Sequence, residues 1–212
     1  MKQQSVILEI IVYSLIVCFL IVPPFFTPAL TSGSELFNWS FPIKQLILSG
    51  FTIVLYLIFD KYIGFYVKYP YSFSKLGCAF PVILAIVYYV SRQYAVPKAS
   101  LYTAVSGAHG IINFLLTFFC SAIYEEMMYR WYFPRQTIRL LLFKWDSKVF
   151  VYLGQLIGAA AFAFAHLYLG WGSVIVAFFA HFFFNWVFYS TGSIWNCIFI
   201  HFAYNIVVWI LS

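Results

Sequence analysis

Two adjacent glutamates and an arginine lie inside an apolar stretch of this 212-residue chain, in the segment Tyr124-Glu125-Glu126-Met127-Met128-Tyr129-Arg130. Neighbouring residues of an α-helix point about 100° apart, so the two carboxylates need not share a role. Glu126 and Arg130 are four residues apart on one helical face, where an ion pair is expected. Glu125 is then free to face a polar cavity. The alternative is that all three residues form a structural ion network.

Two later segments repeat the four-residue spacing of one helical face. The first holds Phe162 and His166, preceded by Gly158-Ala159-Ala160-Ala161, whose small side chains would let another helix approach closely. The second holds His201 and Asn205, which can point into one cavity. Each segment has a simpler explanation, because a histidine near the end of a membrane span, or polar groups between spans, often only supply hydrogen bonds.

The composition is that of a membrane protein. Hydrophobic residues make up 64% of the chain and charged residues only 8%, whereas soluble domains have roughly 25% charged residues. Side chains that face lipid are apolar, so a bilayer explains this composition. The net charge of +6 does not indicate a nucleic-acid site, since the charges are scattered between apolar runs and form no patch.

The apolar runs predict an all-α fold, a polytopic membrane helix bundle with about seven transmembrane helices. The first run would be a signal peptide if it were cleaved, but it is long for one and ends in no small-residue cleavage site, so we expect a retained helix. We expect one membrane domain over residues 1–212, with N-terminal helices that carry no recognisable motif (1–107) and a catalytic core (108–212). The seven runs are Ser5–Phe26, Ile43–Phe59, Leu76–Val90, Ile111–Phe133, Val149–Leu167, Ser173–Tyr189 and Ser193–Leu211.

Lysine and arginine between the spans predict a cytoplasmic N-terminus, because positive residues are retained on the inner side of a membrane. With seven spans, eight of these residues fall inside and only Lys44, Arg92 and Lys98 fall outside. The four cysteines have no metal-ligand spacing and are interpreted as buried thiols. They are Cys18, Cys78, Cys120 and Cys197.

The three polar segments, in this order, resemble the motifs of the CPBP (CAAX protease and bacteriocin-processing) family of intramembrane proteases. That family has Glu-Glu-x-x-x-Arg, then Phe-x-x-x-His, then His-x-x-x-Asn on successive membrane helices. The turn Thr191-Gly192-Ser193 before the last helix is also similar, and the resemblance covers about residues 120–206. Two features differ or compete: Trp131 stands where members often have glycine, and a second His-x-x-x-Asn, at His181 to Asn185, is interpreted as a decoy.

The resemblance implies peptide-bond hydrolysis inside the membrane. Glu125 would be the general base, His166 would hold the same water, and His201 with Asn205 would donate hydrogen bonds to the oxyanion. Glu126, Arg130 and Phe162 would support them. The implied partners are the lipid bilayer and a peptide or protein substrate, either a prenylated or membrane-anchored peptide or a leader or signalling peptide. The expected location is the cell membrane, and in particular a bacterial plasma membrane.

Two alternatives to this interpretation stay open. Two histidines and a glutamate could bind zinc, as in other proteases, but the helical motif His-Glu-x-x-His is absent, so we expect no metal cofactor. Some relatives act as scaffolds, regulators or bacteriocin self-immunity proteins. The complete motif set favours an enzyme, and a transporter would not need these three motifs in order.

Overall fold

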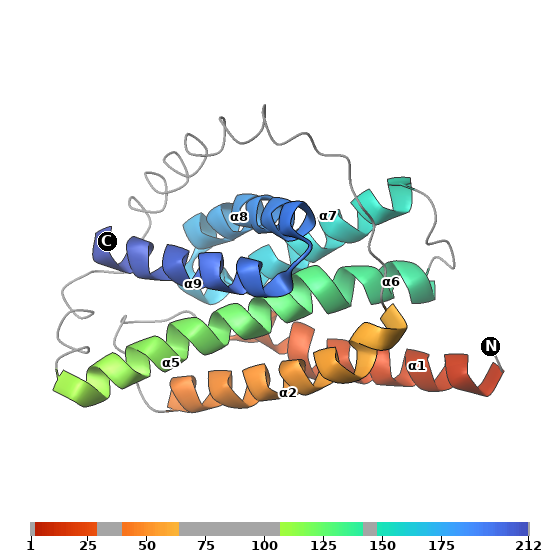
Figure 1. Ribbon diagram of the computed structural model, residues 1–212, viewed down its shortest axis with the longest axis horizontal. Helices are drawn as coiled ribbons and strands as arrows, with labels where there is room; N and C mark the ends of the chain where they lie inside the picture. Colours follow the sequence, from red (N-terminus) through yellow and green to blue (C-terminus); the bar gives the residue numbers. More distant parts are fainter. Residues whose placement is uncertain (1–2, 29–39, 64–106, 142–147, 212) are drawn as a thin grey trace.

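In the computed structural model, residues 3–28, 40–63, 107–141 and 148–211 are described, and every regular element that they form is a helix (Figure 1). The long helices are α1 (Gln3–Ile16), α2 (Ser40–Ile63), α5 (Gly107–Glu126), α6 (Phe133–Leu141), α7 (Lys148–Phe164), α8 (Trp171–Thr191) and α9 (Ile194–Leu211). Short 3-10 or π-helical segments are η1 (Val17–Ile21), η2 (Pro23–Phe26), η4 (Met127–Tyr132) and η5 (Leu167–Leu169).

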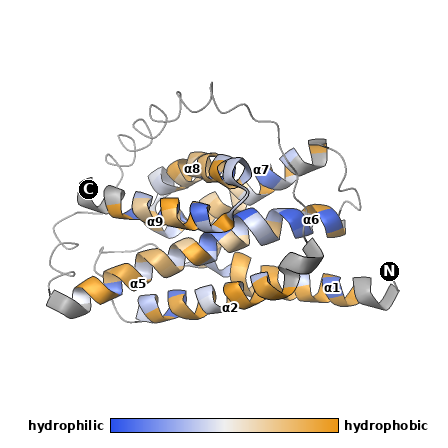
Figure 2. Ribbon diagram, in the orientation of Figure 1, coloured by the Kyte–Doolittle hydropathy of each residue, from blue (hydrophilic) through white to orange (hydrophobic). Residues whose placement is uncertain are grey.

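Four helical stretches of the described chain are long and apolar enough to cross a bilayer, namely Ile7–Phe26, Ser40–Ile58, Gly110–Leu140 and Trp171–Thr191. Much of the outer surface is apolar: Phe19 is 71% exposed and Phe26 is 79% exposed. Hydrophobic colour covers much of α1, α2 and α5, while α6 is more hydrophilic (Figure 2). This arrangement, with apolar side chains outward, identifies a helical membrane protein.

The predicted total of seven spans is not confirmed. The third predicted span, Leu76–Val90, lies outside the described residues. The fifth is represented by a shorter apolar helix, Tyr152–Phe164. The last predicted span corresponds to α9, a helix of 18 residues.

The fourth predicted span is one long helix that changes its winding in the middle. α5 continues through η4 into α6 without a break. Proline at position 134 has no N–H and its ring would clash with the carbonyl four residues earlier. The wider π-helical turns of η4 come just before this proline, where the backbone N–H of Phe133 bonds to the carbonyl of Met128. Such a local change of winding lets a long helix accommodate a proline without ending.

Helix α7 lies very close to this long helix because of its glycines. A Cβ atom added at Gly158 would be 2.7 Å from Pro134 Cγ and 2.9 Å from the Tyr129 carbonyl oxygen. A Cβ at Gly154 would be 2.6 Å from Ile138 Cγ1. The predicted close approach at Gly158 is therefore present, and it brings α7 against η4, where the charged residues lie.

The N-terminal helices pack against the long helix. Tyr13 of α1 and Thr137 of α6 share a hydrogen bond of 2.6 Å, and the Tyr124 hydroxyl donates to the Leu20 carbonyl at 2.6 Å. Glu9 and Arg139 form an ion pair at the edge of the same interface. Figure 1 shows the N-terminus, the end of α2 and α6 at one end of the molecule. That end carries basic residues that were predicted to face the cytoplasm, Lys61, Arg135, Arg139 and Lys148.

Candidate active site

Glu126 lies at the centre of the helical core with no exposed surface. Its Oε1 is 2.7 Å from an Arg130 guanidinium nitrogen and accepts a hydrogen bond from His201 Nδ1 at 2.5 Å. Its Oε2 accepts a hydrogen bond from the Cys197 thiol at 2.8 Å. The predicted Glu126–Arg130 ion pair is therefore present, and it also connects α5 to α9, because a buried carboxylate requires several donors.

Arg130 is also fully buried, on π-helical segment η4. Its guanidinium lies 4.5 Å from the centre of the Phe162 ring and 4.8 Å from that of Phe184. Two aromatic faces and one carboxylate thus surround this cation in place of water. The arginine consequently holds α7 and α8 against the long helix.

Glu125 points in a different direction from Glu126, as the helical spacing predicts, and its side chain is 13% exposed. Its Oε1 accepts a hydrogen bond from the hydroxyl of Ser121, one turn earlier on α5. Its Oε2 lies 3.7 Å from Nε2 of His166 and 3.7 Å from Nε2 of His201. These separations are too long for direct hydrogen bonds but within the reach of one water molecule. Helix α5, the turn after α7 and helix α9 thus bring one carboxylate oxygen and two imidazole nitrogens close together.

His166 does not lie on α7, contrary to the prediction that it shares a helical face with Phe162. The helix ends at Phe164, and the backbone N–H of His166 bonds to the Ala163 carbonyl, only three residues back. This tight turn leaves the carbonyl of Phe162 free, and it accepts a hydrogen bond of 2.8 Å from the His166 ring nitrogen Nδ1. The ring is therefore fixed by the unused carbonyl at a helix end.

The two histidines present the same ring atom to Glu125. A carbonyl and a carboxylate can only accept, so Nδ1 carries the proton both in His166, bound to Phe162, and in His201, bound to Glu126. In each neutral ring Nε2 then has a free lone pair. Each ring can accept a hydrogen bond at Nε2, or donate one there after it gains a second proton.

An open pocket lies beside Glu125 and His166. Tyr124, Tyr129 and Tyr168 line it, together with residues of the N-terminal helices. Burial raises the pKa of the Tyr168 hydroxyl, and the nearby Glu125 carboxylate raises it further. Tyr168 is therefore a neutral phenol at physiological pH.

The structure joins three of the four predicted catalytic residues, and Phe162 packs among them with 1% of its surface exposed. Its ring centre is 4.6 Å from that of His166 and 6.3 Å from that of His201. Asn205 is partly buried one turn beyond His201, and its part in the site stays a prediction.

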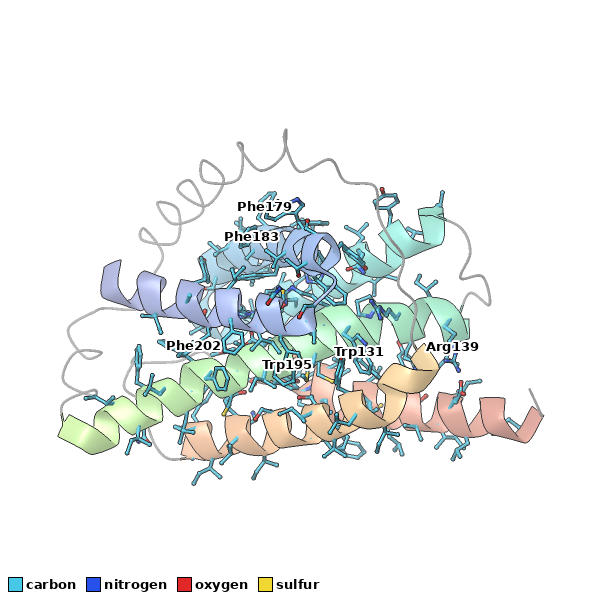
Figure 3. The ribbon with its side chains drawn as sticks, viewed as in Figure 1. Trp131, Arg139, Phe179, Phe183, Trp195 and Phe202 are labelled. Carbon is cyan, nitrogen blue, oxygen red and sulfur yellow. The ribbon has the colours of Figure 1, made fainter. Side chains whose placement is uncertain are left out.

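The second His-x-x-x-Asn pair packs against α7. His181 is fully buried beside Phe162, with its ring 5.8 Å away, and Asn185 donates a hydrogen bond of 2.7 Å to Gln155. Trp131, which replaces a common family glycine, is labelled in Figure 3 and is 2% exposed. The centre of its ring is 4.9 Å from that of Tyr56 on α2. This tryptophan therefore fixes α2 against the core.

Sequence reasoning missed two residues that hold the glutamates. Ser121 precedes Glu125 by four residues on α5, and Cys197 precedes His201 by four residues on α9, so helical spacing could have indicated both. Cys197 and Cys120 are buried thiols as predicted, whereas Cys18 is exposed, and Cys78 lies outside the described residues. Cys18 lies on η1, where an apolar side chain can face lipid.

Glu125, His166 and His201 carry the ligand atoms that zinc prefers. However, within the described ranges no group of three or more His, Cys, Asp and Glu side chains is placed to hold a metal ion. The absence of a metal ion from the site therefore stays a prediction.

A comparison with protein families identifies the part of the chain that carries these residues. Residues 107–207, just under half of the chain, match the family described as type II CAAX prenyl endopeptidase Rce1-like. The match agrees with the family resemblance of the three polar motifs. The match includes Glu125, His166, His201 and Asn205, and it implies peptidase activity for the Rce1-like region. Neither the curated proteins nor the solved structures include a chain that matches this one.

Proposed function

We propose that this protein is an intramembrane endopeptidase in which Glu125 activates a water molecule to hydrolyse a peptide bond. The observation that carries the proposal is the convergence of Glu125 Oε2 with Nε2 of both His166 and His201, each 3.7 Å away. The Rce1-like match supports the peptidase class. The chemistry assigned to each group below follows from its hydrogen bonds.

Glu125 and His166 hold the attacking water. The Ser121 hydroxyl occupies one oxygen of Glu125, so the other oxygen is directed to the water. His166 accepts a hydrogen bond from the same water through Nε2, because its Nδ1 proton is bound to the Phe162 carbonyl. As the water oxygen bonds to the substrate carbonyl carbon, one proton passes to Glu125. The carbonyl oxygen becomes an oxyanion.

His201 and Asn205 stabilise that oxyanion. His201 donates a hydrogen bond from Nε2 when that nitrogen carries a proton, while its Nδ1 stays bound to the Glu126 carboxylate. The Asn205 amide supplies the second donor. The oxyanion then collapses, the carbon–nitrogen bond breaks, and Glu125 returns its proton to the leaving nitrogen. Glu126 and Arg130 take no part in bond making; they hold His201 in place.

We further propose that the reaction needs no metal ion and takes place in a bacterial plasma membrane. The substrate would be a lipidated or membrane-anchored peptide, or a leader or signalling peptide. The pocket beside Glu125 supports this substrate class, because its lining is rich in aromatic and aliphatic side chains within a membrane-embedded bundle.

The test compares wild-type protein with Glu125→Gln in proteoliposomes, using a mixed library of synthetic peptides and mass spectrometry of the products. The amide keeps the shape of the side chain but cannot accept the proton, so cleavage should fall at least about a hundredfold. Glu9→Gln is the matched control, because Glu9 forms a partly exposed ion pair on α1 far along the chain from the site. It should cleave like wild type, and near-normal cleavage by Glu125→Gln would refute the proposed mechanism.

The same variant separates an enzyme from a scaffold. A scaffold, regulator or self-immunity protein would keep its cellular phenotype when Glu125 is replaced by glutamine and the protein level is unchanged. An endopeptidase would lose it.

A further inference from the structure

The pocket beside Glu125 takes much of its wall from helices outside the Rce1-like region. Phe19, Pro23, Phe41 and Leu48 give an apolar surface from η1, η2 and α2. The family match covers only residues 107–207, so these N-terminal residues lie outside it. Whatever enters the pocket therefore contacts residues of the N-terminal helices as well as residues of the Rce1-like region.

This wall is held in place and is already formed without substrate. The Tyr124 hydroxyl donates to the Leu20 carbonyl beside the pocket, at 2.6 Å. The ring centres of Tyr56 and Trp131 are 4.9 Å apart where α2 packs against η4. A surface fixed in this way loses little conformational entropy when it binds a ligand.

Two polar residues from the start of α2 interrupt the apolar wall. Gln45 is only 8% exposed, and its Oε1 has no hydrogen-bond partner within the part of the chain that the structure describes. A buried amide oxygen without a partner costs free energy, which a ligand N–H would recover. Lys44 also lines the pocket, and apart from Glu125 it is the one charged side chain among the described lining residues.

We propose that Lys44 and Gln45 form a substrate subsite, in which Lys44 binds a carboxylate of the peptide and Gln45 accepts a backbone N–H beside it. This inference rests on the proposed function, because it assigns the substrate of the same site. Glu125 repels an anion, whereas the Lys44 ammonium attracts one, so the two charges orient a peptide along the pocket. The carboxylate is either the C-terminus of the peptide or the side chain of an acidic residue.

The first experiment varies the charge of the peptide and of Lys44 together. Peptides that wild-type protein cleaves and Glu125→Gln does not are made in four forms, with a free or amidated C-terminus and with an acidic residue or its amide. We expect Lys44→Gln to lower kcat/KM about three- to tenfold for the carboxylate forms and less than twofold for the neutral ones. Lys44→Arg should keep the preference.

The controls distinguish a subsite from an anchor for the membrane surface. A lysine near the end of a span often extends to the headgroups without binding substrate. In that case Lys44→Gln would affect neutral and acidic peptides equally, and the proposal would be wrong. Ile47→Ala, a lipid-exposed position on the same helix, should leave the preference unchanged. If amidation of the C-terminus removes the effect of Lys44, the subsite binds the terminal carboxylate. If replacement of the acidic residue by its amide removes that effect, the subsite binds an acidic side chain.

Gln45→Leu separates a role of Gln45 in peptide binding from a purely structural role. Removing an unpaired buried amide should leave the protein as stable as wild type, or more so, while peptide binding weakens. Binding is measured with Glu125→Gln protein and fluorescent peptides by anisotropy, so it needs no cleavage. If wild-type protein cleaves no peptide, the proposed function is wrong. The anisotropy measurement still shows whether the subsite binds a carboxylate. Equal affinity for the carboxylate and the amide peptides would refute the proposed subsite.

Discussion

Replacing Arg130 by methionine tests whether the buried ion pair holds the bundle together. Methionine keeps most of the apolar volume but leaves the Glu126 carboxylate without its cation, at a position with no exposed surface. Removing one partner of a buried pair costs about 3–5 kcal/mol. His201 and Cys197 still donate to the two oxygens of Glu126, at 2.5 and 2.8 Å. We therefore expect the lower end of that range, about 3 kcal/mol.

The control is a second ion pair on the same long helix. Arg139 and Glu9 form a pair whose side chains are 25% and 27% exposed. Water already stabilises these charges, so Arg139→Met should cost less than about 1 kcal/mol. Both variants remove one arginine from the same long helix, and they differ in the burial of the pair.

A double-mutant cycle then isolates the pair itself. Glu126→Gln together with Arg130→Met removes both charges, so the double variant should lose less stability than the two single losses added together. The expected coupling is about 1–3 kcal/mol. The free energy of unfolding is measured by titrating detergent-solubilised protein with sodium dodecyl sulfate and following tryptophan fluorescence. Equal losses for Arg130→Met and Arg139→Met, or a cycle without coupling, would refute the reasoning.

Two further predictions concern packing and metal dependence. Gly158→Ala should destabilise the protein by about 1–3 kcal/mol, because its Cβ would be 2.9 Å from the Tyr129 carbonyl oxygen. Gly50→Ala is the control and should be neutral or stabilising, because nothing lies within 4 Å of a Cβ at that position. Equal unfolding midpoints for the two variants would contradict this prediction. Purified protein should contain less than one zinc per chain by elemental analysis and keep its activity after treatment with a strong chelator; activity lost on chelation and restored by zinc would reverse the proposed metal-free mechanism.

Helical periodicity alone was enough to predict the features that lie within one helix. Residues four apart share a helical face in any context, so the Glu126–Arg130 pair could be predicted without a tertiary structure. The apolar runs likewise gave spans that agree with α1, α2 and the long α5–α6 helix, because a bilayer requires that length of apolar chain. The turn before α9 followed the same local rules, with Gly192 in the left-handed conformation at φ 66° and the Ser193 hydroxyl accepting from the Asn196 N–H.

Contacts between helices depended on tertiary structure. The bond from His201 to Glu126 joins residues that are 75 positions apart, and the thiol of Cys197 reaches the same carboxylate across a similar span. Sequence order says that two motifs follow one another, but it does not say which atoms meet. The prediction that His166 lies on the same helical face as Phe162 was wrong, because α7 ends at Phe164.

The sequence by itself determined that this chain is a helical membrane protein and which polar residues it carries into the bilayer, because hydrophobicity and helical spacing are local properties. The close packing of α7 at Gly158, the shared direction of both histidine rings toward Glu125, and the pocket wall supplied by α2 were decided only by the tertiary structure. Each depends on the distance and rotation between helices that are far apart in the chain, and these are set by how the side chains of both helices pack together.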